Sequence, residues 1–271
     1  DGRTLAVGAH REDSAATTVN EDQGDDVASA VDSGATYVFV REATDWSQQA
    51  YVKGSRSSTF DSFGYAVSLS FDGSTLAVTA LREDGVEDIS ESGATYIFTR
   101  TGALWTEQAL LRSDSPVEHG FFGAALALSA DGNTLAAGSG GDPGNATGIN
   151  RPRAPTPLLE SGAAYVFVRN GAAWTQEAYV KASNAEERDA FGVSVALSSD
   201  GNTLAVGALW EDSAAIGVNG NQSDNTAVDV GAAYVFGRSG ATWSQTMYVK
   251  PGKSPLPQWC GWSVSLSGDG N

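Results

Sequence analysis

The segment FGVSVALSSDGNTLAVGA at residues 191–208 contains two short runs of small and β-branched residues on either side of an Asp-Gly pair. Such runs predict β-strands, and Asp200-Gly201 predicts a tight hairpin between them because both residues tolerate positive φ angles. The same arrangement returns along the chain. Asp-Gly pairs stand at residues 1–2, 72–73, 131–132, 200–201 and 269–270. An internal repeat therefore decides the fold.

Two further markers keep the spacing of this repeat. Glycines precede the third predicted strand of each copy, at Gly34, Gly93, Gly162 and Gly231, and tryptophans begin the fourth, at Trp46, Trp105, Trp174 and Trp243. Both sets step by 59, 69 and 69 residues. Helix caps and a 3.6-residue periodicity are missing, so each copy is predicted to be a meander of four antiparallel strands.

We therefore expect an all-β fold, a β-propeller of four-stranded antiparallel blades, as a single domain over residues 1–271. The repeats are expected at approximately 1–62, 63–121, 122–190 and 191–259, followed by a closing strand within 260–271. The chain begins and ends inside the same hairpin. Residues 262–267 are thus expected to pair with residues 3–9 and close the ring, since an unpaired edge strand is a liability. The alternative is that the chain is a fragment of a longer array, such as a seven-bladed one.

Two short elements link the repeat to a known family. Phe-Gly opens the copies at residues 63–64, 122–123 and 191–192, and a Gly-Ala-like element follows the second strand at residues 8–9, 79–80, 138–139 and 207–208. Together they resemble the FG-GAP repeats of integrin alpha-subunit heads and their bacterial relatives. Proline is missing from the second element, and Cys260-Gly261 replaces the last Phe-Gly.

The resemblance implies a propeller that engages ligands through the loops between strands two and three of each blade. It also implies an extracellular or cell-surface location, which we expect to be bacterial. Integrin-type repeats often hold calcium between strands one and two. Here that connection is only Ser199-Asp200-Gly201-Asn202 and its equivalents, too short to wrap a cation, so calcium is not expected at those positions.

The net charge of the chain limits the kinds of partner that it is expected to bind. The chain has 16 Lys and Arg residues against 33 Asp and Glu residues, a formal net charge of −17. This charge repels nucleic acid and anionic membranes and attracts cations or basic partners. No run of 18 apolar residues is present, so we expect no membrane insertion. Cys260 is the only cysteine, which excludes an internal disulfide.

The predicted loops between strands two and three differ most among the copies, at residues 10–32, 81–91, 140–160 and 209–229. Variable loops on a rigid scaffold are where binding usually resides. Three of them start with an acidic pair, and we take these pairs as candidate ligand-binding residues: Glu12, Asp13, Glu83, Asp84, Glu211 and Asp212. They would gather cations or a basic ligand. The alternative is that they cap loop amides.

The first and fourth loops also carry oxygen-bearing side chains at alternate positions. These are Asn20, Asp22 and Asp26, and Asn219, Asn221, Ser223 and Asp224. Calcium sites use such alternation, so calcium is the one cofactor that the sequence suggests. Runs rich in Asn, Gly and Asp are equally typical of turns.

Catalysis is not expected. His10 and His119 stand in different contexts, Cys260 has no evident base, and no Gly-x-Ser-x-Gly element exists. The leading hypothesis is a non-enzymatic binding or adhesion propeller with a protein or glycan ligand. One alternative is a lectin-like propeller in which the four repeated tryptophans stack on sugars, although packing explains a fixed position equally well. Another is a structural subunit that binds copies of itself.

Overall fold

The computed structural model describes residues 2–21, 30–85, 89–153, 156–252 and 258–270. These residues form sixteen β-strands and no helix. Consequently, no helix in the described ranges is available to cross a membrane. Every pair of neighbouring strands is antiparallel, which confirms the predicted all-β class.

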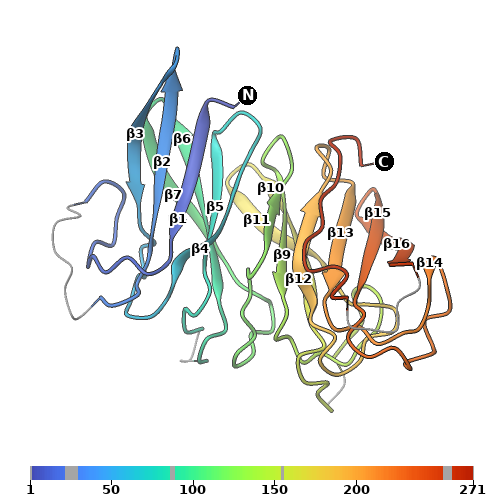
Figure 1. Cartoon of the computed structure of the whole chain (residues 1–271). Helices are drawn as coiled ribbons and strands as arrows, with labels where there is room; N and C mark the ends of the chain where they lie inside the picture. The colour runs from blue at the N-terminus through green and yellow to red at the C-terminus, as the bar shows by residue number, and fades with distance from the viewer. Residues whose placement is uncertain (1, 22–29, 86–88, 154–155, 253–257, 271) are drawn as a thin grey trace. The chain divides into compact units, whose positions relative to one another are not determined.

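The strands form four sheets, one for each predicted repeat (Figure 1). The first sheet contains β1 (Thr4–Ala9), β2 (Ala35–Glu42) and β3 (Asp45–Val52). The second contains β4 (Phe63–Leu69), β5 (Thr75–Ala80), β6 (Ala94–Thr101) and β7 (Leu104–Leu111). The third contains β8 (Leu126–Leu128), β9 (Thr134–Ser139), β10 (Ala163–Asn170) and β11 (Ala173–Val180). The fourth contains β12 (Phe191–Leu197), β13 (Thr203–Ala208), β15 (Ala232–Ser239), β16 (Thr242–Lys250) and the short β14 (Gly217–Val218).

The chain divides into two compact units. Unit 1 comprises Asp1–Gly123, Ala130–Gly132 and Asn170–Trp174, and unit 2 comprises Ala124–Ser129, Asn133–Arg169 and Thr175–Asn271. Unit 1 contains the first two sheets, and unit 2 contains the fourth sheet and most of the third. The expected single domain stays a prediction.

The predicted Asp-Gly hairpins are confirmed, and the aspartate explains their shape. Between β12 and β13, Leu197 pairs with Leu204, and Gly201 adopts a φ of 70°. The Asp200 carboxylate accepts hydrogen bonds from the Ser198 hydroxyl and, at 2.9 Å, from the Asn202 amide. These bonds lower the pKa of Asp200. The side chain therefore closes the turn that the glycine permits.

Contacts between glycine backbones hold neighbouring sheets close together within each unit. A Cβ on Gly138 in β9 would lie 1.9 Å from the carbonyl oxygen of Gly192 in β12, and one on Gly8 in β1 would lie 1.9 Å from that of Gly64 in β4. The first residue of each pair belongs to the Gly-Ala element, and the second follows Phe63 or its equivalent Phe191. An added Cβ at Gly8 or Gly138 would push the two backbones apart, so the two sequence elements mark one contact. In the second copy Thr79 takes the place of the glycine, and its hydroxyl donates to the Gly123 carbonyl oxygen at 2.7 Å.

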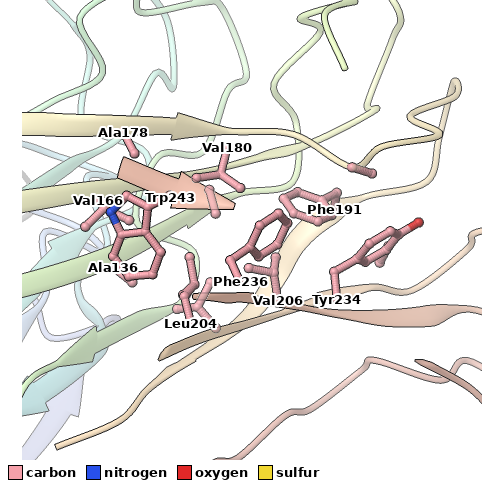
Figure 2. Packing of buried hydrophobic residues seen from close by; sticks show 14 of the residues in the cluster. Ala136, Val166, Ala178, Val180, Phe191, Leu204, Val206, Tyr234, Phe236 and Trp243 are labelled. Atoms are coloured by element: carbon pink, nitrogen blue, oxygen red, sulfur yellow. The ribbon is translucent and has the colours of Figure 1, made fainter. Parts of the chain in front are cut away.

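The core of unit 2 lies between its two sheets (Figure 2). Bulky side chains of the fourth sheet, among them Leu204, Phe236 and Trp243, are buried there. They meet small or β-branched residues of the third sheet, such as Ala136 and Val166. Bulky side chains of one sheet thus pack against small or β-branched ones of the other, which allows the sheets to approach closely.

The first sheet has three strands, and its face is less covered than the others. Leu5 and Val7 on β1 are 45% and 43% exposed, whereas the equivalent Leu76 and Val78 on β5 are fully buried. Residues 262–267, which were expected to complete this sheet, are not assigned to a strand. The four-stranded repeat is therefore shown for the later sheets, and ring closure stays a prediction.

Candidate functional site

A buried ion pair recurs at the end of each sheet where the second strand of the repeat ends. In three copies the carboxylate is the first member of the predicted acidic pair, and in the third copy it is Asp142 at the equivalent position. The cation lies at or just after the end of the fourth strand of the repeat, or on the loop between strands two and three. The pairs are Glu12 with Lys53 (3.0 Å), Glu83 with Arg112, Asp142 with Arg153 (2.6 Å) and Glu211 with Lys250 (2.5 Å). Lys181, fully buried, lies 4.0 Å from Asp142. Burial lowers its pKa to about 8.

A tyrosine hydroxyl completes each of these networks. Tyr51 donates to Glu12 at 2.8 Å, and Tyr96 donates to Glu83 at 2.6 Å. Equivalent bonds run from Tyr179 to Asp142 and from Tyr248 to Glu211, both at 2.9 Å. Burial raises the pKa of all four tyrosines. The carboxylates Glu12, Glu83 and Glu211 are therefore already bound to partners inside the protein.

The second member of each acidic pair closes its loop. Asp13 accepts the main-chain N–H of Asp32 at 2.7 Å, Asp84 that of Glu91 at 3.0 Å, and Asp212 that of Asp229 at 2.7 Å. This arrangement matches the capping alternative. A ligand-binding role for the six acidic residues stays a prediction.

The asparagines of the proposed calcium positions are also part of the fold. Asn20 and Asn219 have positive φ angles of 58° and 55°, and each exchanges two hydrogen bonds with the backbone of a tyrosine on the outer strand, Tyr51 or Tyr248. Asn150, which the sequence did not single out, does the same with Tyr179. These asparagines extend the sheet by one pair of bonds.

The other described calcium candidates, Asn221 and Asp224, form hydrogen bonds with residues two positions further along the chain. Asn221 accepts the Ser223 amide at 3.1 Å, and Asp224 accepts the Thr226 hydroxyl at 2.6 Å. Asp22 and Asp26 lie outside the described residues. In the described ranges, no group of three His, Cys, Asp or Glu side chains is arranged to hold a metal ion. Calcium binding stays a prediction.

Unit 1 contains a cleft of about 410 Å³ between the loops 54–62 and 81–91. Its lining residues are Arg56, Ser58, Thr59, Phe60, Asp61, Arg82, Glu83, Asp84, Gly85, Ser90 and Glu91. The volume lies in the range of small-ligand pockets. Of the predicted ligand-binding residues, the structure brings Glu83 and Asp84 to this cleft.

Charges of both signs face the cleft. Asp61 is buried, and this burial raises its pKa to about 7. Glu83 has a raised pKa for the same reason, opposed by bonds to Tyr96 and Arg112. Arg56 is exposed, as is most of the Arg82 side chain. The cleft therefore offers both hydrogen-bond donors and acceptors to a polar ligand.

An exposed aromatic ring adds an apolar contact. Phe60 is 54% exposed and lies beside Asp61 in the chain. The sequence did not single out these two residues, because they belong to the loop that joins one repeat to the next. The candidate residues were sought in the loops between strands two and three, which differ most among the copies. One signal was present, since Asp61 returns as Asp189 at the same position of its repeat.

The repeated tryptophans mainly contact protein. Trp105 and Trp243 are buried, and their ring N–H groups donate to Gln49 and Glu177 on outer strands of neighbouring sheets. Trp174, half-buried, donates to Gln108 at 3.0 Å. Trp46 alone among the four is exposed, at 46%. Packing therefore explains two of the four fully.

Comparison with known proteins agrees with the repeat. Residues 46–98 and 174–236 match the FG-GAP repeat family. No curated protein has a sequence that matches this chain. A hypothetical selenium-binding protein from Sulfolobus tokodaii is similar in structure, with a TM-score of 0.47 and 9% identity over 80% of this chain. The tricorn protease gives a TM-score of 0.36 and 9% identity over 75% of this chain.

These two solved structures are longer than the present chain, which spans 47% of the first and 16% of the second. The family match instead rests on the residues that make the fold. Both matched segments run from the fourth strand of one repeat, through a Phe-Gly and a Gly-Ala-like element, to the third strand of the next repeat. The chain is an FG-GAP repeat protein.

Proposed function

We propose that this chain is a non-enzymatic binding propeller that acts outside the cell, at a bacterial surface or in the surrounding medium. In this proposal the four sheets are blades, and the loops at one end of the blades engage a protein or glycan ligand. The FG-GAP repeats support the propeller and its extracellular setting. The charge of −17 favours a partner with basic surface groups.

The observation that carries the proposal is the cleft in unit 1. It combines an exposed aromatic ring, Phe60, with two arginines and two buried carboxylates. A few polar groups around an aromatic side chain are typical of recognition sites.

The proposal is tested by binding to arrays of glycans and of purified surface proteins. We expect a specific partner whose binding weakens at least tenfold in a Phe60→Ala/Arg82→Ala variant, because aromatic and arginine side chains dominate recognition energies. The matched control is Phe71→Ala/Arg151→Ala, which removes an exposed ring and an exposed arginine elsewhere. Equal loss in both variants, or the lack of any partner, would contradict the proposal.

A structural role receives separate support from the first sheet. Leu5, Val7 and Trp46 form an exposed apolar face on a sheet that has one strand fewer than the second. We propose that residues 262–267 supply the missing strand, because their sequence WSVSLS parallels YAVSLS at 65–70 in β4. In a closed ring, this strand comes from the same chain. In a structural subunit, it comes from a second copy of the chain.

A further inference from the structure

Unit 2 shows what occupies the region that corresponds to the cleft of unit 1. The loops 54–62 and 182–190 hold the same position in their repeats. In each loop, an aspartate accepts the main-chain N–H of the residue three places earlier: Asp61 from Ser58 at 2.6 Å, and Asp189 from Glu186 at 2.8 Å. Burial raises the pKa of both aspartates to about 7. The two regions are therefore built alike.

In unit 2 the long loop 209–229 folds against this region. The Gln222 side chain accepts a hydrogen bond from the Ser183 hydroxyl at 2.6 Å, and the Gln222 main-chain carbonyl accepts one from the Asn184 amide at 3.5 Å. Asn225 donates to the Glu186 carboxylate. A short polar peptide of the chain itself thus lies against residues 183–186.

Among the described residues of unit 1, no segment takes the place of residues 222–225. The loop 81–91 of unit 1 is ten residues shorter than 209–229. The positions of Asn184 and Glu186 are taken by Arg56 and Ser58, and both line the open cleft. In the described part of the chain, Arg56 makes no hydrogen bond or ion pair within bonding distance.

A buried hydroxyl behind the cleft also lacks a partner. Ser92 is 97% buried, and its Oγ has no hydrogen-bond partner among the described residues. It faces Gly85, which lines the cleft, because a Cβ on that glycine would lie 2.6 Å from the hydroxyl. The equivalent Ser33 is bonded to Lys53, which Arg112 replaces in the second sheet. Such an unsatisfied group favours a polar occupant nearby.

We infer that the cleft of unit 1 binds a short polar peptide segment of a partner protein, in the place that residues 222–225 take in unit 2. This inference rests on the proposed binding function and names its ligand class. Arg56 donates to a main-chain carbonyl of the peptide, as Asn184 does to Gln222. Asp61 and Asp84 accept from peptide N–H groups, and Phe60 covers the apolar part of a side chain.

The probe is a synthetic peptide with the sequence of residues 217–229, labelled with a fluorophore, and the readout is fluorescence anisotropy. We expect saturable binding to the full chain. Arg56→Ala should weaken it roughly tenfold or more, since a hydrogen bond from a charged donor is lost. Arg151→Ala, which removes an exposed arginine from unit 2, should leave the dissociation constant unchanged. No binding, or equal binding to both variants, would overturn the inference.

A loop graft tests the same cleft without relying on affinity for a free peptide. Residues 85–91 are replaced by residues 213–229, with and without Arg56→Asn/Ser58→Glu, which restores the unit 2 partners. We expect the double substitution to raise the melting temperature in the graft and not in the parent chain. The graft should also lose binding of the labelled peptide. An identical temperature change in both backgrounds would refute the inference.

Failure of the inference differs from failure of the binding function. If a glycan binds the array and its binding depends on Phe60 and Arg82, while the peptide does not bind, the binding function holds and the peptide class is wrong. If neither ligand class binds, both proposals fail.

Discussion

The Nζ atom of Lys250 lies 2.5 Å from Oε2 of Glu211, and both side chains are buried. The Glu211 carboxylate also accepts a hydrogen bond from the Tyr248 hydroxyl, and the main-chain carbonyl of Glu211 accepts a further one from Lys250. An acidic residue that begins a variable loop is thereby tied to the end of the outer strand. The loop can differ in length while its first residues remain fixed.

Removing one partner of this pair should be costly. We expect Glu211→Gln to destabilise the chain by about 3–5 kcal/mol, because Lys250 is left as an uncompensated buried charge. Urea denaturation followed by circular dichroism measures this. The double variant Glu211→Gln/Lys250→Met should recover part of the loss. A single variant within about 0.5 kcal/mol of the parent would show that the pair is unimportant for stability.

The stability of the fold should fall as the pH rises from about 4 to about 7. Asp61 and Asp189 have folded-state pKa values of about 7, above the ordinary aspartate value of 3.8, because both carboxyls are buried. The folded state therefore holds these protons over that interval while the unfolded state releases them. Their contribution is complete below about pH 4 and is lost as the pH passes 7.

The test of this dependence is the pair of substitutions Asp61→Asn/Asp189→Asn. The charges facing Asp61 are Glu83, Asp84 and Arg112, and those facing Asp189 are Glu186, Glu211 and Asp212. We expect the variant to have a flatter profile of melting temperature against pH and a gain in stability at pH 7. Asp45→Asn on an exposed hairpin is the control. An unchanged slope in the double variant would exclude these groups as the cause.

The glycine contact between sheets should not accept a methyl group. Gly138→Ala places a Cβ 1.9 Å from the Gly192 carbonyl oxygen, so β9 and β12 must move apart. We expect a loss of about 1–3 kcal/mol or more from overpacking. Gly140→Ala is the control because no atom lies within 4 Å of its added Cβ. Equal stability of the two variants would mean that the contact is looser than described.

The pairing of residues 262–267 with β1 has a defined register. In the second sheet, Ser68 lies opposite Ala77 and Val67 opposite Val78. By the same alignment, Ser265 should lie opposite Ala6. With Cys260 replaced by serine, the variant Ala6→Cys/Ser265→Cys should form a disulfide under mild oxidation. A crosslinked monomer indicates a closed ring, and a crosslinked dimer indicates a structural subunit.

The absence of any crosslink would contradict this pairing. The control is Val7→Cys/Ser265→Cys, which is displaced by one residue and points the two side chains to opposite faces. Denaturing gel electrophoresis without reductant reads out both variants.

The hairpins of the fold could be predicted from the sequence, because they depend on residues with a strong conformational preference of their own. Asp200-Gly201 forms the hairpin because glycine takes a positive φ angle and the aspartate bonds the turn. The alternation of strands and turns could be predicted for the same reason. The division into two units could not be predicted, because it depends on contacts between residues distant in the sequence.

The candidate site was predictable only in part. The acidic pairs stood out by their repetition, but their buried partners did not, since Lys53 and its equivalents follow an outer strand that appeared solvent-exposed. The repeat spacing of 59, 69 and 69 residues also applies to these cations. The cleft itself arises from the short loop 81–91, and its lining becomes apparent only when residues 56–61 are seen beside it.

The glycine contact has a consequence for how the protein can change. Where Gly8 meets Gly64 and Gly138 meets Gly192, main-chain atoms set the distance between the two sheets, so that distance does not depend on the loops around them. Substitutions and insertions in the loops leave this distance unchanged. Natural selection can therefore diversify the recognition surface and conserve the architecture as two independent processes, provided that the paired glycines are retained.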